Sequence, residues 1–125
     1  MAAVRLLVDT DVLIDYFNTG LHAAVLDGRG CRVYYSIVTR KELLAKRGLR
    51  DSERRSIVEE LRRFRLIPLT PAIAARYALV RQRHRWLERE DALIAATAMV
   101  KRLPLMTRDR RHFGRVEGLD LFEGR

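Results

Sequence analysis

Short apolar stretches alternate with helical patterns along the chain. The stretches combine aliphatic, β-branched and aromatic residues, and they cover residues 4–8, 32–35, 66–69, 103–107 and 119–122. Between them, apolar residues recur at steps of three and four, which is the period of an α-helix. This alternation predicts an α/β protein in which helices cover both faces of a parallel sheet. The last stretch follows a turn at Gly118 and is expected at the edge of the sheet.

The longest predicted helix spans residues 71–88. Thr70 is a suitable N-cap, and Pro71 fits the first helical turn. The inward stripe of this helix consists of Ile73, Tyr77, Val80, His84 and Leu87. We interpret His84 as a partly buried structural histidine rather than a catalytic one.

Two further helices have distinct patterns. One is predicted over residues 51–64, with Asp51 or Ser52 as its cap. Its inward residues are Ile57, Val58, Leu61 and Phe64. The other begins near Asp91 and reads DALIAATAMV, which is apolar or small on every side. Such a helix is expected to be buried.

Length and composition limit the class of protein. With 125 residues, 48% of them hydrophobic, the chain is sufficient for one compact core, so we expect one domain over residues 1–125. We find no secretory signal and no apolar stretch near the roughly 20 residues that cross a bilayer, so we expect a soluble, cytoplasmic protein without membrane contact. Cys31 is the only cysteine, which excludes an internal disulfide; we expect it buried in a strand.

The net charge points to a polyanionic partner. Twenty-five Lys and Arg oppose sixteen Asp and Glu, a formal charge of +9, which attracts phosphate backbones without selecting a sequence. Candidate RNA contacts are the basic clusters at 40–55 and 81–89, although a solvated Arg-rich surface is the alternative. Trp86 is the lone candidate for base stacking, and we expect it instead in or near the core or a dimer contact.

Two aspartates directly follow predicted strands. Asp9 comes after RLLV, the best candidate for the central strand, and Asp109 follows LPLMT. In an open parallel sheet the functional crevice lies beyond the carboxyl ends of the strands, so both side chains are expected at one edge. Thr10 or Asp11 can cap the helix that continues after Asp9.

Two more carboxylates stand at predicted helix starts. Asp91 is placed at the beginning of the buried helix, where it is either a rigidly held site residue or simply the N-cap. Glu42 lies in SIVTRKELLA and borders the apolar side of that helix. It can therefore reach inward, or it can form a surface salt bridge with Arg40 or Lys46.

Four carboxylates in one pocket repel each other, and their pKa values rise unless a cation is present. Oxygen ligands without cysteine or paired histidines favour Mg²⁺ or Mn²⁺ over zinc. A divalent metal of this kind lowers the pKa of a bound water and stabilises the charge that develops on a phosphodiester. The sequence therefore predicts metal-dependent phosphodiester hydrolysis, with arginines holding the nucleic acid.

Four segments in this order resemble the PIN domain, and most closely the VapC-type ribonuclease toxins of toxin–antitoxin pairs: LVDTDVLID, SIVTRKELL, DALIAATA and LMTRDRRHF. The resemblance covers nearly the whole chain. It implies a three-layer α/β/α fold with a five-stranded parallel sheet, and metal-dependent cleavage of single-stranded or structured RNA. It also implies a cognate antitoxin and a homodimer.

Carried over by position, the resemblance assigns specific roles. The acidic quartet falls on Asp9, Glu42, Asp91 and Asp109. Asp9 and Asp91 are implied as direct metal ligands, and Glu42 and Asp109 as residues that orient metal or water. Thr107 and Asp11 match accessory polar positions, with Asp11 equally suited to cap a helix. Asp15 is expected to be a surface or structural residue.

The chain departs from the family pattern at two places. The approach to Asp91, RHRWLERED, is densely charged and lacks glycine, and it contains Glu88 and Glu90 as rival ligands. After Asp109, Arg111 and His112 stand where some relatives carry another acid. These departures suggest that one metal is held firmly and a second only with substrate.

Three functional hypotheses follow. The leading one is an endoribonuclease toxin that requires Mg²⁺ or Mn²⁺. The second is a housekeeping PIN nuclease that processes RNA without an antitoxin, for which a neighbouring antitoxin gene is the discriminating observation. The third is a non-catalytic RNA-binding module, which would bind metal without turnover on varied RNAs.

Overall fold

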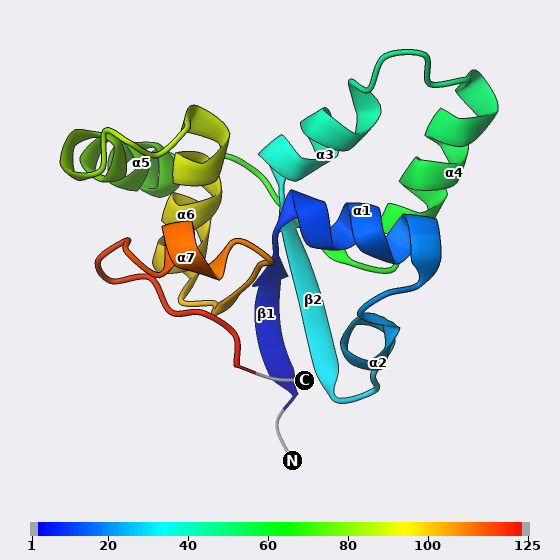
Figure 1. Ribbon diagram of the computed structural model, residues 1–125, viewed down its shortest axis with the longest axis horizontal. Helices are drawn as coiled ribbons and strands as arrows, with labels where there is room; N and C mark the ends of the chain where they lie inside the picture. Colours follow the sequence, from blue (N-terminus) through cyan, green and yellow to red (C-terminus); the bar gives the residue numbers. More distant parts are fainter. Residues whose placement is uncertain (1–2, 124–125) are drawn as a thin grey trace.

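The structure is a computed structural model that describes residues 3–123. Each of the first three strands is followed by two helices, and the last strand by one (Figure 1). The strands are β1 (Val4–Val8), β2 (Cys31–Ser36), β3 (Arg65–Ile67) and β4 (Leu105–Met106). The helices are α1 (Thr10–Thr19), α2 (Ala23–Leu26), α3 (Ile37–Leu44), α4 (Asp51–Leu61), α5 (Pro71–Arg83), α6 (Arg89–Lys101) and α7 (Arg110–Phe113).

The sheet is parallel throughout, in the order β3-β2-β1-β4. β1 is central, as predicted, and pairs with β2 on one side and β4 on the other. Four strands form within the described residues instead of the five that the resemblance implied. The stretch 119–122 makes one parallel bridge, between Leu105 and Leu121, because its neighbour β4 is only two residues long.

Both faces of the sheet are buried, which confirms the three-layer α/β/α prediction. Leu6 and Val8 point into a core shared with α1, α2 and α4, while Leu7 points into a second core with α5, α6 and α7. All three side chains are fully buried. Figure 1 shows α5 and α6 on one side of β1 and α1 and α2 on the other. Because both faces of β1 are covered, its sequence is continuously apolar from residue 6 to residue 8.

The helix predicted over 71–88 ends at Arg83. His84 takes φ −127° and ψ 68°, outside the helical region, and the chain turns before α6 starts at Arg89. The Arg81 guanidinium donates to the carbonyl of Leu87 at 2.9 Å and stabilises this turn. His84 and Leu87 are nevertheless buried, so the structural interpretation of His84 agrees with its position.

Other boundaries also differ from the prediction. α4 ends at Leu61 instead of residue 64, and its N-cap is Arg50 in place of Asp51 or Ser52. The Arg50 backbone and guanidinium both donate to Oε1 of Glu53, at 3.2 and 2.9 Å, so the Glu53 carboxylate ties the residue before the helix to the first turn. Phe64 is buried just beyond the helix.

Three remaining expectations concern exposure. α6 is buried as predicted, along Ala92, Ile94, Ala95, Ala96, Thr97 and Ala98. Cys31 lies in β2 but is only half-buried. Trp86 is 41% exposed and therefore does not lie in the core, while the other expectation for it, a dimer contact, stays a prediction. Among the described residues, no helix is long and apolar enough to span a bilayer.

Candidate active site

Asp9 is held rigidly at the end of β1. It is the N-cap of α1, a role the sequence had suggested for Thr10 or Asp11, and one carboxylate oxygen accepts from the Thr10 backbone N–H at 2.8 Å. The other oxygen accepts from the Thr107 hydroxyl at 2.8 Å. The residue is only 5% exposed. Burial raises the pKa of Asp9, and these two hydrogen bonds partly oppose that shift.

Thr107 joins the ends of β1 and β4. Its hydroxyl donates to Asp9 and accepts from the Asp109 backbone N–H at 3.0 Å. Asp109 is the N-cap of α7, and its side chain accepts from the His112 backbone at 3.3 Å. Its other oxygen lies 2.7 Å from Nδ1 of His112, a contact that lowers the pKa of Asp109. The two aspartates therefore lie at one edge of the sheet, as their positions after parallel strands had predicted, and both hydrogen-bond to Thr107.

Glu42 reaches the same region from α3. Its Oε1 accepts from the Thr10 hydroxyl at 2.8 Å. That hydroxyl lies 2.8 Å from the fully buried hydroxyl of Thr39. Because Thr10 has one hydroxyl proton and gives it to Glu42, Thr39 is the donor in the second bond. Burial is the main cause that raises the pKa of Glu42, and within residues 3–123 no ion pair joins Glu42 to a base.

Asp91 lies in the first turn of α6 and is not its N-cap, because the helix begins two residues earlier, with Glu88 as the extended cap residue. Its pKa is raised to about 6, first by burial and then by repulsion from Asp9, Glu88, Asp109 and Glu42. Three of these four are the other members of the predicted quartet. The fold therefore brings all four carboxylates into one electrostatically coupled group.

Neighbouring acids border this group. Glu88 repels Asp91, and Glu90 repels Glu42. Asp11 is exposed in the first turn of α1 and raises the pKa of both Asp9 and Glu42. Glu88 and Glu90 thus lie close to the site, where the sequence had marked them as rival ligands to Asp91.

Arg108 is a site neighbour that sequence reasoning missed. One of its amino groups lies 3.1 Å from both carboxylate oxygens of Asp15, and the other lies 3.7 Å from Asp11. Asp15 also lies 3.5 Å from Nε2 of His22. Asp15 therefore has the structural role expected of it, since it ties α1 to the segment that carries Thr107 and Asp109. The signal available in the sequence was the position of Arg108 between those two residues.

The donor set suits a hard divalent cation. All four side chains offer oxygen. Burial first, and repulsion between neighbouring acids second, raise the pKa values of Asp9, Glu42 and Asp91. In the part of the chain that the structure describes, no three or more His, Cys, Asp or Glu side chains are placed so that they could together hold a metal ion. Mg²⁺ commonly binds one or two carboxylates and keeps several waters, so an open arrangement of this kind fits that ion.

The raised pKa of Asp91 predicts a pH-dependent stability. Since the pKa is about 6 in the folded chain and 3.8 ordinarily, protonated Asp91 favours the folded state. Its contribution is complete below the ordinary pKa and is lost as the pH rises through the folded value. In EDTA, the melting temperature of the wild type should therefore fall more between about pH 5 and about pH 7.5 than that of Asp91→Asn. Equal falls in thermal unfolding scans would contradict the prediction.

A parallel sheet between two layers of helices, with four carboxylates gathered beyond its strand ends, defines an α/β protein with an acidic candidate site. The chain belongs to the PIN domain family, whose sequence model matches residues 6–119. It is 37% identical over 122 residues to Ribonuclease VapC10 of Mycobacterium tuberculosis, covering 91% of this chain and 90% of that protein. It is 29% identical over 126 residues to Ribonuclease VapC1 of Methanocaldococcus jannaschii, covering 95% and 88%.

Solved structures agree with the fold. A toxin–antitoxin complex from Klebsiella pneumoniae contains a chain with 29% identity and a TM-score of 0.72, with 91% of this chain and 94% of that chain covered. VapBC2 from Rickettsia felis, bound to a DNA fragment from its promoter, gives a TM-score of 0.81 at 17% identity, covering 95% and 98%. At 17% identity, the similarity to the Rickettsia felis structure shows the fold alone.

Proposed function

We propose that the chain is a divalent-metal-dependent endoribonuclease that acts as the toxin of a toxin–antitoxin pair. The single observation that carries the proposal is the convergence of the acids. Thr107 bonds to both Asp9 and Asp109, Glu42 accepts from Thr10 beside Asp9, and Asp91 is close enough to be repelled by all three acids. Carboxylates that repel each other at fixed positions are expected to bind a cation. The names of the two curated relatives, both ribonucleases, support RNA as the substrate.

Each acidic residue has a role in this proposal. Asp9 and Asp91 would hold Mg²⁺ or Mn²⁺, and the metal would supply an activated water and stabilise charge on the scissile phosphate. Glu42 and Asp109 would orient the metal's water ligands, with Asp109 held in turn by His112. Thr107 fixes the carboxylate of Asp9 through its hydroxyl. Asp11 would act as an outer acid that adds to the negative potential.

A cleavage assay tests this function. Purified protein, free of any partner, is incubated with total RNA and with short single-stranded and hairpin RNAs, in EDTA and then with added Mg²⁺ or Mn²⁺. Cleavage should be absent in EDTA and should appear with either ion. Cleavage that proceeds unchanged in EDTA would reject the metal-dependent mechanism. Metal binding without turnover on any of these RNAs would favour a non-catalytic RNA-binding module.

The basic clusters at 40–55 and 81–89 are proposed to hold the RNA backbone. If so, the logarithm of the association constant should fall by about 0.7 per contacted phosphate for each tenfold rise in salt. Replacing one exposed basic residue, as in Arg85→Ser, removes one phosphate contact and should therefore make the slope less steep by about 0.7. Filter binding or fluorescence anisotropy across a salt series measures it. A flat salt response would remove the clusters from the RNA contact.

The partner is proposed to be a small antitoxin protein. The named Klebsiella pneumoniae structure is a toxin–antitoxin complex, which supports such a partner here. A groove between α1, α3 and α4 is lined by apolar side chains that include Ile14, Leu43 and Ile57, and Glu42 lies on its wall. A segment bound there would border the acidic site.

A homodimer is also proposed, and light scattering of the purified chain tests it.

The alternative within the same fold is a housekeeping RNA-processing nuclease without an antitoxin. Expression separates the two possibilities. A toxin should arrest growth when it is produced alone, and co-expression of the neighbouring reading frame should restore growth. A housekeeping nuclease should not arrest growth, and co-expression of the neighbouring reading frame should then have no effect on growth.

A further inference from the structure

Trp86 has an unusual position for a large apolar residue. It lies in the turn between α5 and α6, and it is 41% exposed. Its immediate neighbours are polar or charged. The Cζ atom of Arg115 lies 4.6 Å from the centroid of the indole ring, and the ring of His112 lies 6.1 Å away at an interplanar angle of 34°. His84 meets the ring edge-on, with centroids 5.7 Å apart.

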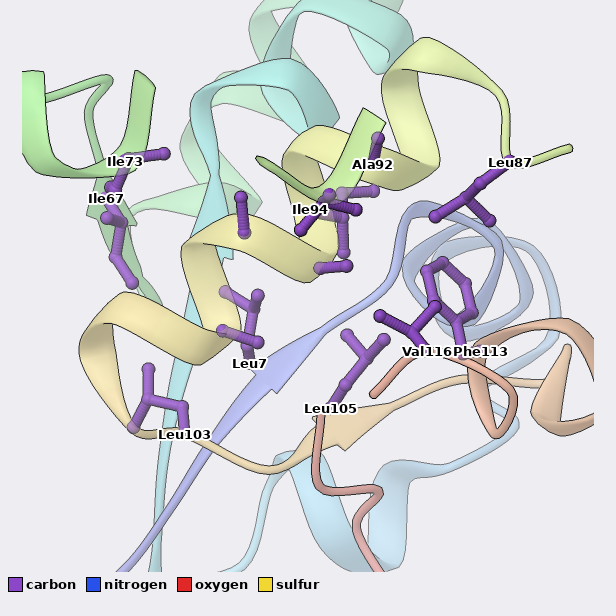
Figure 2. Close-up of a cluster of buried hydrophobic side chains, with 14 residues drawn as sticks. Leu7, Ile67, Ile73, Leu87, Ala92, Ile94, Leu103, Leu105, Phe113 and Val116 are labelled. Carbon is purple, nitrogen blue, oxygen red and sulfur yellow. The ribbon is translucent and has the colours of Figure 1, made fainter. Parts of the chain in front are cut away.

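The two segments that carry these side chains are fixed against each other by the core. Leu87, Phe113 and Val116 are all buried in one apolar cluster. Figure 2 shows their side chains together, at the end of the cluster where the turn before α6 meets the segment around α7. Each of the three is next in sequence to Trp86, His112 or Arg115 respectively. The exposed trio therefore stands on a rigid base, which a preorganised binding surface requires.

The trio also adjoins the acidic site. Nδ1 of His112 lies 2.7 Å from the carboxylate of Asp109. Trp86 precedes Asp91 by five residues, and Asp91 lies in the first turn of α6, which starts three residues after Trp86. One indole ring is thus connected, through a single imidazole, to one of the four coupled carboxylates.

The surroundings of Trp86 favour an anionic aromatic ligand. Arg85, Arg111 and Arg115 are exposed, and within residues 3–123 no acidic side chain forms an ion pair with any of them. A guanidinium over an indole ring leaves positive charge beside an aromatic surface. A nucleotide matches both properties, because its base can stack while its phosphate pairs with a guanidinium.

We propose that Trp86, together with His112 and Arg115, forms a stacking platform for one unpaired nucleobase of the RNA substrate, next to the acidic site. The proposal rests on the proposed ribonuclease function and adds a specificity-determining contact to it. Stacking on an indole tolerates every base but requires that the base be unpaired. The platform would therefore select single-stranded positions and place the adjoining phosphate near Asp109.

Because Trp86 is the only tryptophan in the chain, its fluorescence reports on this surface alone. The test uses the full chain with Asp9→Asn to prevent cleavage, titrated with a short single-stranded RNA. The RNA should quench the indole emission to saturation. An oligonucleotide of equal length and charge with abasic nucleotides should bind about 5- to 150-fold more weakly and leave the emission unchanged. Equal affinities, with no change in emission for either oligonucleotide, would overturn the platform.

Kinetics with matched variants provide the second readout. Trp86→Leu should raise KM for single-stranded RNA by about 5- to 150-fold, since an aliphatic side chain cannot stack. Trp86→Phe, which keeps an aromatic face, should stay near the wild-type KM. A wild-type KM for Trp86→Leu, with metal-dependent cleavage intact, would reject the platform and leave the ribonuclease assignment standing. Absence of metal-dependent cleavage in the wild type would instead reject the ribonuclease.

Discussion

Asp9→Asn is expected to lower the kcat/KM of RNA cleavage by at least about a hundredfold. Loss of a residue that only hydrogen-bonds to a metal ligand usually lowers activity by less, about 10- to 100-fold. The side chain is 5% exposed and fixed by Thr10 and Thr107. An amide of the same shape can keep the bond from the Thr10 backbone but brings no negative charge to a cation. The measurement is cleavage of a labelled single-stranded RNA at saturating Mg²⁺, with purified protein free of partners.

The same substitution should not destabilise the metal-free fold. Asp9 is one of the groups that raise the pKa of Asp91, so a neutral residue there relieves repulsion. Thermal unfolding in EDTA should therefore show an equal or higher melting temperature. Asp15→Asn is the matched control, because Asp15 lies on the helix that Asp9 caps but is outside the quartet and pairs with Arg108. This variant should retain most of the activity. Wild-type cleavage by the Asp9→Asn protein would remove Asp9 from the mechanism.

Phe113→Ala is expected to reduce the free energy of unfolding by about 3–5 kcal/mol. The ring is 1% exposed and packs with Leu87 and Val116 in the core beneath α7 (Figure 2). Its removal takes away apolar burial and leaves a cavity that the surrounding strands and helices fill only partly. A loss of this size is a large share of the roughly 5–15 kcal/mol that stabilises a typical domain. Urea denaturation, followed by circular dichroism, measures it.

Two controls limit the interpretation of Phe113→Ala. Phe113→Leu should cost less, because leucine fills much of the same volume. Val4→Ala, at a side chain that is 49% exposed, should change the free energy by about 0.5 kcal/mol or less. If Phe113→Ala matched Val4→Ala, the packing of α7 described above would be wrong.

Local signals in the sequence were sufficient for much of the architecture. Continuous apolar runs predicted buried parallel strands, and Asp9 and Asp109 follow β1 and β4 as expected. Helix ends were less predictable. The stripe from Ile73 to Leu87 continues past Arg83, because residues beyond a helix end can still be buried at helical spacing. α5 ends where His84 leaves the helical backbone conformation, and the pattern of side chains does not indicate that change.

Contacts between distant segments could not be derived from the sequence. Thr10, Thr39 and Glu42 form a hydrogen-bonded chain that depends on how α1 packs against α3. Thr107 had been suggested only by resemblance, and its bond to Asp9 depends on the register between β1 and β4. Patterns along a helix or strand specify which face is buried, but not which residue of another element lies opposite.

The edge strands of the sheet are short, and this affects how copies of the chain can associate. β3, at one edge, is three residues long, begins with an exposed Arg65 and is followed closely by Pro68. At the other edge, β4 is covered by the bridge from Leu121. Neither border offers a long row of free backbone groups, so strand-to-strand aggregation is disfavoured. We therefore expect any pairing of two molecules to use helical surfaces rather than an extended, shared sheet.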